Sequence, residues 1–529
     1  MATLLHPGVY VLEVPSGTRS IEGAATSTAI FVGETERGPA GPVRITSRSD
    51  YERIFGGYFR VRDADSPPVD PSRVLTAYAI DGFYQNGGSA AYVLRAMDAP
   101  ETGPVTAARG PVEASSPGLW GNSVFTAFLK AGAGAGVGRF RIAVVYQSPA
   151  TGERELVEVW DRLSVDRADE NFVGDVLQRS QFIRWQDDAP LTVPALDSLG
   201  SPPSDDPDRN AIIDGAAAMT TEGEGGGGEL TPADYAVLLE QLAGVDDAAM
   251  LVATCDALLS GDSAYAQFVD AFIGYAQNQR PRQDLFFVGD LPRHTSGGDP
   301  GQGTSAALTS FAELNATNFA GIFWPHLVIS DIAGQGRNPM LTIPPAGHVA
   351  GVFARTDGTR GVWKAPAGVE ATLNGALSLE LALNDLHSDS LNPAGVNALR
   401  QIPGAGRVVW GSRTMQPSSE WRYISVRRTA IFLRTSIYNG IQWAVFEPND
   451  KPLWDSLQAT IGGFMETQFR RGAFAGQTSK DAYLVKVDAE TTTPIDQAAG
   501  VVNILVAFAP LRPAEFVVVQ LSQKTQPVA

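Results

Sequence analysis

Between residues 231 and 324 the sequence alternates between strand-forming and helix-forming segments, and this alternation constrains the fold more than any other feature. Helices are expected at 264–279 and 305–314, and Thr231-Pro232-Ala233-Asp234 has the cap residue and first-turn proline of a helix start. Three apolar runs typical of buried strands separate them, at 250–254, 284–290 and 320–324. Strands separated by helices favour a parallel sheet with helices on its faces. We therefore predict a parallel α/β domain over 231–370.

An earlier strand–helix–strand run predicts further strands of the same kind. The segments 27–33 (STAIFVG) and 91–95 (AYVLR) are typical of buried strands, and 71–86 is typical of a helix that stops at Gly87-Gly88. Such a run favours α/β packing. Residues 23–96 are therefore expected to form the first part of an α/β core.

The remaining segments differ from this pattern. Residues 97–230 contain short β-prone runs, Gly- and Pro-rich turns and an acidic low-complexity stretch, which predict a β-rich insertion with an acidic linker. Residues 371–511 contain two long amphipathic helices and late strands, which predict a helix-rich α/β domain. Residues 1–22 and 512–529 are β-prone ends without a local partner. The predicted fold class is a multi-domain α/β (α+β) protein with extended terminal β arms.

Composition excludes several classes of function. The 529 residues carry a net charge of −18, which argues against contact with nucleic acid. A single cysteine, Cys255, allows neither an intramolecular disulfide nor a cysteine-based zinc site. The N-terminus lacks the pattern of a secretory signal, and the most apolar stretch, 501–511, is about half of what a bilayer-spanning helix needs. We expect a soluble protein without direct membrane insertion, folded in a reducing compartment.

The charge is unevenly distributed along the chain. Residues 161–247 contain 19 acidic and 5 basic residues, whereas 407–480 contain 10 basic and 5 acidic residues. The acidic stretch is best explained as solvated surface. The basic stretch is also rich in aromatic and apolar residues, so it is either a solvated face or a surface for an acidic partner.

No motif predicts catalysis, a cofactor or a metal. Gly223, Gly225 and Gly228 have dinucleotide-binding spacing but lie in an acidic run that would repel phosphate, as expected of a linker. The surroundings of Ser305 and His348 resemble those of the subtilisin-type serine and histidine, but Ser305 precedes His348, which reverses that family's order. Two alternatives stay open: a subtilisin-like serine hydrolase, and a monomeric protein that binds carbohydrates or surfaces.

The chain resembles contractile tail sheath proteins of myophage tails, R-type pyocins and phage-tail-like contractile injection systems. The segment 343–366, IPPAGHVAGVFARTDGTRGVWKAP, is similar to the signature of that family. Further similar stretches follow in family order over nearly the whole chain, at 6–17, 116–123, 157–166, 391–414, 421–437 and 443–450. Most of their distinctive residues are Gly, Pro, aromatic or Arg, which suits a structural protein.

The resemblance implies a polymer that works by contraction. Sheath subunits form stacked six-membered rings around an inner tube, and the metastable extended sheath contracts to drive the tube through a target envelope. The implied partners are other sheath subunits, the inner tube protein, and baseplate and terminal cap proteins. It also implies assembly in the bacterial cytoplasm, as part of a phage tail or tail-like particle that stays there or is released. The 231–370 domain would then have a subtilisin-like topology without catalysis.

The resemblance also assigns roles to the ends of the chain. The 371–511 domain would be the assembly domain that contacts the tube, and the insertion would lie outside. With the charge asymmetry, this makes the helix at 452–469 and its basic surroundings the tube-contact candidates: Lys451, Arg470 and Arg471 first, then Arg427, Arg428 and Arg434. Arg470 and Arg471 could instead complement the helix dipole, and the second group could form ion pairs between subunits.

The terminal arms are expected to pair with sheets of neighbouring subunits. A β-prone end without a local partner either pairs within its own subunit or adds to an exposed sheet edge of another chain. The resemblance favours the second hypothesis, and a contact of this head-to-tail kind propagates into a helical filament. The candidate residues are Val9, Val11, Phe516, Val517, Val518 and Val519.

Overall fold

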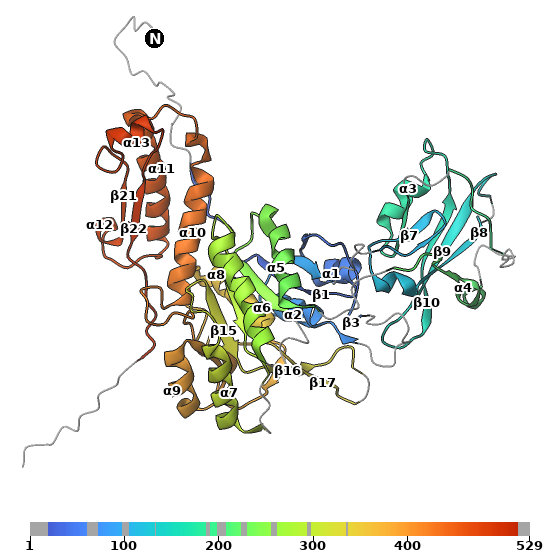
Figure 1. The fold of residues 1–529 in the computed structure, drawn as a ribbon, viewed down its shortest axis with the longest axis horizontal. Helices are drawn as coiled ribbons and strands as arrows, with labels where there is room; N and C mark the ends of the chain where they lie inside the picture. Colours follow the sequence, from blue (N-terminus) through green and yellow to red (C-terminus); the bar gives the residue numbers. More distant parts are fainter. Residues whose placement is uncertain are drawn as a thin grey trace, which may run out of the picture. The chain divides into compact units, whose positions relative to one another are not determined.

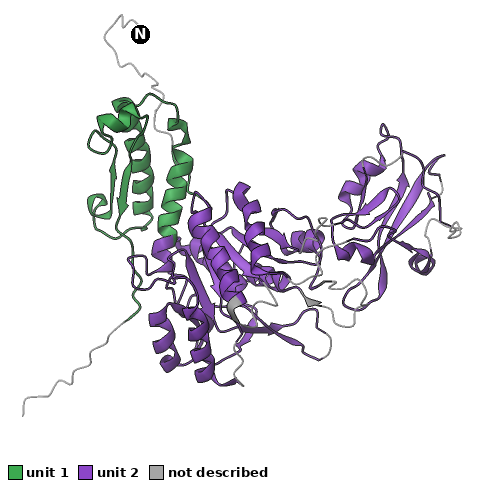
Figure 2. Ribbon diagram, viewed as in Figure 1, with its two compact units in different colours: residues 1–24, 428–529 green, residues 25–427 purple. Residues whose placement is uncertain are grey.

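The computed structural model divides the chain into two compact units (Figure 2): unit 1 comprises residues 1–24 and 428–529, and unit 2 comprises residues 25–427. Unit 1 thus combines both ends of the sequence. The described residues are 20–60, 72–97, 105–132, 134–186, 191–197, 208–223, 230–254, 262–293, 298–334 and 337–516.

A largely parallel eight-stranded sheet forms the centre of unit 2 (Figure 1). Its six inner strands are parallel, and the edge strands β2 and β20 are antiparallel to their neighbours. The order is β2 (Val43–Ile45), β5 (Ala91–Ala96), β1 (Ala29–Glu34), β13 (Met250–Thr254), β14 (Phe286–Asp290), β15 (Ala320–Trp324), β19 (Val396–Ile402) and β20 (Gly406–Val409). The predicted α/β class is confirmed, because apolar runs separated by helices do form parallel strands.

Helices cover both faces of this sheet. The strands are apolar throughout, so side chains on both faces must be buried. Ile30, Leu251 and Phe287 belong to the core that includes α5 (Pro232–Glu240), α6 (Asp262–Gly274), α7 (Pro300–Ala312) and α9 (Asp385–Ala394). Side chains at alternate positions of the strands point to the opposite face of the sheet. Phe31 packs on Phe83 of α2 (Leu75–Gln85), and Phe323 packs on Phe353 of α8 (Ala346–Arg360).

The predicted domain boundary at 370/371 does not coincide with the division between the units at 427/428. The strands β19 and β20 lie after residue 370, yet β19 pairs in parallel with β15 and completes the central sheet. This pairing joins segments that are about 70 residues apart in the sequence. No local sequence pattern therefore predicts that the two strands are neighbours. The small antiparallel sheet of β16 (Leu327–Ser330), β17 (Met340–Ile343) and β18 (Ala376–Leu379) also joins segments from both sides of residue 370.

The residues between β5 and α5 form two antiparallel sheets with their own core around Trp120 and Phe140. One sheet has the order β10 (Arg154–Leu163), β9 (Phe140–Gln147), β8 (Val124–Lys130) and β12 (Ala217–Ala218). The other has the order β11 (Ile183–Trp185), β7 (Val112–Ala114) and β6 (Ala108–Arg109). Short helices accompany them, α3 (Val173–Val176) and α4 (Arg209–Gly215). Unit 2 also contains α1 (Arg48–Phe55), β3 (Phe59–Arg60) and β4 (Ser72–Arg73).

Unit 1 contains two long helices and a two-stranded sheet. The division between the units falls within α10 (Ile424–Gly440), and α11 (Lys451–Arg470) packs on it through Phe432 and Phe464. The antiparallel strands β21 (Tyr483–Lys486) and β22 (Leu505–Phe508) pair with each other, and α12 (Ser479–Ala482) and α13 (Pro494–Ala498) are short. Residues 20–24 lie alongside α10, because the Ala24 amide donates a hydrogen bond to Ser436 Oγ over 2.9 Å.

Candidate assembly surfaces

The helix α11 carries the first group of tube-contact candidates, and its position follows from its sequence. Asp450 caps the helix, since its side chain accepts a hydrogen bond from the Leu453 amide over 3.3 Å. The buried residues Leu453, Leu457 and Ile461 recur every four residues and hold one face of the helix inward. The charged residues at both ends are therefore left on the surface.

The structure does not bring these charged residues together. Lys451 and Arg470 are the first and last of the 20 residues of α11, so they lie about 28 Å apart along the helix axis. Each has a local partner: Lys451 pairs with Asp455 at 2.6 Å and Arg470 with Glu466 at 2.9 Å. The hydrogen bond from Arg470 lowers the pKa of the Glu466 carboxyl. Arg471 follows the helix and is exposed, so Arg470 and Arg471 form one basic site and Lys451 another.

The second group, on α10, is divided by burial. The Arg427 guanidinium lies over the rings of Phe319 and Trp421, at 3.7 and 5.0 Å from their centroids. Arg428 is only 3% exposed, whereas Arg434 is exposed. Arg427 and Arg428 therefore serve packing in this conformation of the subunit, and Arg434 is the member of this group on the surface.

The sheet of unit 1 provides edges to which an arm could add. In the described part of the chain, β21 and β22 pair as strands only with each other, so each has a second edge with unpaired ladder positions. Leu484 and Leu505 on these strands are about half exposed. Of the arm candidates, Phe516 is described and is exposed outside any strand. Val9, Val11, Val517, Val518 and Val519 lie outside the described residues.

The signature segment, residues 343–366, forms α8, and its glycines permit close contact with α2. A Cβ at Gly347 would lie 2.6 Å from the Ala79 backbone, and one at Gly351 would lie 2.5 Å from the Phe83 carbonyl oxygen. Across the same contact, a Cβ at Gly82 would lie 2.1 Å from His348 Nδ1. The sequence carries the signal for this contact as a Gly-x-x-x-Gly spacing at residues 347 and 351.

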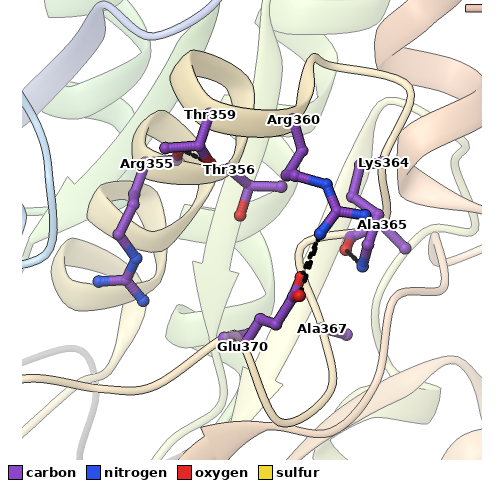
Figure 3. Close-up of a pocket in the computed structure, with 9 residues that line it drawn as sticks. Arg355, Thr356, Thr359, Arg360, Lys364, Ala365, Ala367 and Glu370 are labelled. Carbon is purple, nitrogen blue, oxygen red and sulfur yellow. Dashed lines mark hydrogen bonds and ion pairs between the residues drawn. The ribbon is translucent and has the colours of Figure 1, made fainter. Parts of the chain in front are cut away.

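The end of the signature segment lines a surface pocket of about 270 Å³ (Figure 3). Arg355 donates to the carbonyl oxygens of Asn86 and Thr372 over 3.0 and 2.7 Å. Its guanidinium thus links α8 to the end of α2 and to the loop at residue 372. Arg360 Nη1 donates to both carboxylate oxygens of Glu370, over 3.0 Å to Oε1 and 2.9 Å to Oε2. These contacts give the basic residues of the signature a structural role within unit 2.

The residues of the hydrolase alternative do not form a catalytic pair. Ser305 lies exposed on α7 and its hydroxyl donates to the Gly301 carbonyl over 3.1 Å. His348 is buried on α8, which covers the opposite face of the sheet. Burial lowers the pKa of His348 to about 4, and its Nδ1 has no hydrogen-bond partner in the described part of the chain. His348 is thus a packing residue, and Ser305 lies on the other side of the sheet from it.

The described residues show neither a metal site nor a membrane-spanning helix. They contain no group of three or more His, Cys, Asp or Glu side chains arranged to hold a metal ion. They also contain no helix with both the length and the apolar character needed to cross a bilayer.

Comparison with known proteins defines the class. The phage tail sheath protein central domain matches residues 228–415, and the phage tail sheath C-terminal domain matches residues 416–524. The chain belongs to the phage tail sheath family. The two matches cover more than half of its length and meet at residue 415/416.

Individual relatives agree with this assignment. The tail sheath protein of Vibrio phage KVP40 is 31% identical over 125 residues, which cover 23% of this chain and 19% of that protein. A putative prophage major tail sheath protein of Pseudomonas aeruginosa is 26% identical over 187 residues, covering 34% of this chain and 46% of that protein. The chain thus spans less than half the length of these curated relatives.

The fold is also similar to that of a solved sheath structure. The helical sheath of the anti-feeding prophage in its contracted state is similar with a TM-score of 0.57 and 21% identity, over 99% of this chain and 100% of that chain. At this identity the likeness concerns the fold, and it extends over both units.

Proposed function

We propose that this protein is a structural sheath subunit that polymerises as stacked hexameric rings around an inner tube and contracts from a metastable extended state. The observation that carries the proposal is the match of two consecutive sheath domains over residues 228–524. Contraction would be a rigid-body rearrangement between two packings of the subunits, with the arms as hinges. Its energy would be stored behind a kinetic barrier in the assembly itself.

The tube contact is proposed for the basic site at the end of α11. Arg470 and Arg471 are adjacent and exposed, and charge complementarity with an acidic tube surface would set the register of the contact. Lys451 and Arg434 are separate surface positions that would contribute at other points. The residues of the 371–511 range that follow α10 would then form the tube-facing part of the subunit.

The arms are proposed to link neighbouring subunits by adding to the edges of β21 and β22. Each strand leaves one edge unpaired in the described chain, and an added strand would satisfy those backbone groups. The described half-exposed Leu484 and Leu505 would be covered by side chains of the incoming arm. The other proposed partners are baseplate and terminal cap proteins, and assembly is proposed to occur in the bacterial cytoplasm within a phage tail or tail-like particle.

This function requires no catalysis, and we propose that the protein is not an enzyme. The separation of Ser305 and His348 on helices of opposite faces supports this. Substitution Ser305→Ala is therefore expected to leave assembly unchanged.

Electron microscopy of negatively stained protein tests the proposal. We expect the purified chain, alone or with its tube protein, to form striated tubes or contracted cylinders. Deletion of residues 1–17 is expected to leave folded subunits that do not form long sheaths, because the arm no longer reaches its neighbour. Particles that stay monomeric at high concentration would contradict the sheath function, and full-length sheaths from the deletion variant would contradict only the role of the arm.

A further inference from the structure

The loop that joins α10 to α11 presents an aromatic side chain in an unfavourable backbone conformation. Phe446 has a φ of 68°, in the left-handed region, and its side chain is fully exposed. A bulky residue in this region is an outlier, and such strain persists only where the surrounding structure imposes it. The conformation turns a large apolar surface toward solvent, where it gains nothing in the isolated subunit.

The loop is held firmly on both sides of Phe446. Trp454 Nε1 donates to the Asn449 side chain over 2.9 Å, and the Asn449 amide donates to the Val501 carbonyl over 3.0 Å. Gln497 Nε2 in turn donates to the Asn449 carbonyl over 2.6 Å. Before Phe446, Trp443 and Ala444 pack on the core around Leu457. These contacts anchor the loop on both sides of Phe446.

In Figure 1, α13 and the start of α11 lie at the same end of unit 1. Hydrogen bonds from Gln497 to Asn449 and from Asn449 to Val501 join the segments found there. The hydrogen bonds of Asn449 join the loop to α13 and to residue 501. We define the end patch by its exposed residues Tyr438, Val445, Phe446, Ile495 and Val501. Contiguous exposed apolar residues mark interaction sites more often than solvated surface.

The described N-terminal residues Ile21 and Ala24 lie against the end of α10, close to the end patch. Ile21 packs against Gly440 at the end of α10, since a Cβ on Gly440 would lie 2.6 Å from its side chain, and Ala24 is bonded to Ser436 one turn earlier. Toward the N-terminus the chain thus reaches the point where the 441–450 loop starts. Residues 8–14 (GVYVLEV) are rich in apolar side chains, and six residues of extended chain span about 20 Å.

We propose that the end patch is the docking site of residues 8–14 of the same chain in the unassembled subunit. A segment tethered this close has an effective concentration in the millimolar range, and closing so short a loop costs little entropy. Docking would remove the apolar side chains of Phe446 and its neighbours from water. This burial is a favourable free energy that the isolated loop lacks. The arm would then be held on its own subunit until a neighbour offers a better site.

Dye binding to the unassembled protein tests whether residues 8–14 cover the patch. We expect deletion of residues 1–14 to increase the fluorescence of 8-anilinonaphthalene-1-sulfonate, which reports exposed apolar surface, and Phe446→Ser in the deleted chain to reverse this increase. Leu386→Ser is the matched control, since Leu386 is equally an exposed apolar residue but lies on α9 of unit 2. Equal fluorescence of the full-length and deleted chains would overturn the proposal.

Disulfide trapping distinguishes the same chain from a second copy. In a Cys255→Ser background, Val11→Cys with Phe446→Cys is expected to give an oxidised monomer of altered mobility at low protein concentration. Val11→Cys with Leu386→Cys is expected to give none. Covalent dimers would overturn docking on the same chain in favour of a second copy, and the absence of any disulfide would overturn docking altogether. Both experiments use unassembled subunits, so their outcome does not depend on the sheath function.

Discussion

At the scale of single residues, the close contact between α8 and α2 depends on the absence of side chains. Gly347 and Gly351 approach the α2 backbone to within van der Waals contact of Ala79 and Phe83, and His348 occupies the space above Gly82. Rigid backbone on the facing helix leaves no flexible group that could yield to an added methyl. These glycines explain part of the family signature as a packing requirement.

Substitution Gly351→Ala is therefore expected to destabilise unit 2 by about 1–3 kcal/mol, the usual cost of overpacking. The new Cβ would lie 2.5 Å from the Phe83 carbonyl oxygen and 2.7 Å from Asn86 Cβ. Gly358→Ala on the same helix is the control, because nothing lies within 4 Å of its added Cβ, and alanine in a helix is preferred over glycine by about 1 kcal/mol. Thermal unfolding should show a lower Tm only for Gly351→Ala.

His348 predicts a pH dependence of stability. Burial lowers its pKa from 6.5 to about 4, so the folded protein binds fewer protons at this site than the unfolded chain between these values. Stability is thus complete above pH 6.5 and is lost as the pH falls toward 4, with a loss of about 2 kcal/mol between pH 7.5 and pH 5. Urea unfolding at both pH values measures it, and His348→Asn should remove this part of the dependence. An unchanged dependence in that variant would contradict the assignment.

At the scale of elements, a buried ion pair ties the end of α6 to the turn after α5. Arg280 and Asp284 are 3% and 1% exposed and are bonded to each other, and Arg280 also donates to the Leu242 carbonyl over 2.8 Å. The guanidinium thus satisfies carbonyls at the end of a neighbouring helical segment. Removing one partner would leave a charge buried without compensation.

Asp284→Ala is expected to destabilise unit 2 by about 3–5 kcal/mol, since the Arg280 charge stays in the interior. Glu370→Ala is the matched control, because it removes an exposed ion pair. The side chains of Glu370 and Arg360 are 63% and 52% exposed, so this variant should lose less than about 1 kcal/mol of stability. The double variant Arg280→Met with Asp284→Leu should recover most of the loss. Comparable Tm values for Asp284→Ala and Glu370→Ala would contradict this role of the pair.

Most elements were predictable because their signals are local. The runs at 250–254 and 320–324 form strands with the predicted bounds, and the capped helix at Thr231-Pro232 begins as expected. The helix predicted at 452–469 was also placed within one residue of each end of α11. The sequence did not reveal which residues of an element are buried. Arg427 and Arg428 belong to the basic stretch at 407–480, yet packing turns them inward.

At the scale of the whole molecule, the division into units redistributes the charge. Unit 1 contains 10 basic and 11 acidic residues, whereas unit 2 contains 30 basic and 47 acidic residues. Nearly all of the net charge of −18 thus belongs to unit 2. A nearly neutral unit with an exposed basic site is suited to contact an acidic partner without long-range repulsion.

Charge reversal of Arg470 and Arg471 to Glu is expected to abolish or strongly weaken assembly of sheaths on tubes, and raising the salt concentration should weaken the wild-type contact in the same direction. Arg162→Glu with Arg209→Glu is the control, because it makes the same change in net charge at exposed positions of the insertion. Sedimentation with tubes and electron microscopy measure the outcome. Normal extended particles from the Arg470 and Arg471 variant would show that the tube contact lies elsewhere.

The sequence by itself determined the family, the α/β class and the positions of most helices and strands, because these depend on periodicity, caps and distinctive local segments. It also identified the charged and β-prone candidates for assembly. Only the tertiary structure decided which segments lie together and which lie apart: β19 completes the central sheet, and Ser305 and His348 lie on opposite faces of it. The physical reason is that such proximity is set by packing between segments distant in sequence, for which one chain carries no local signal.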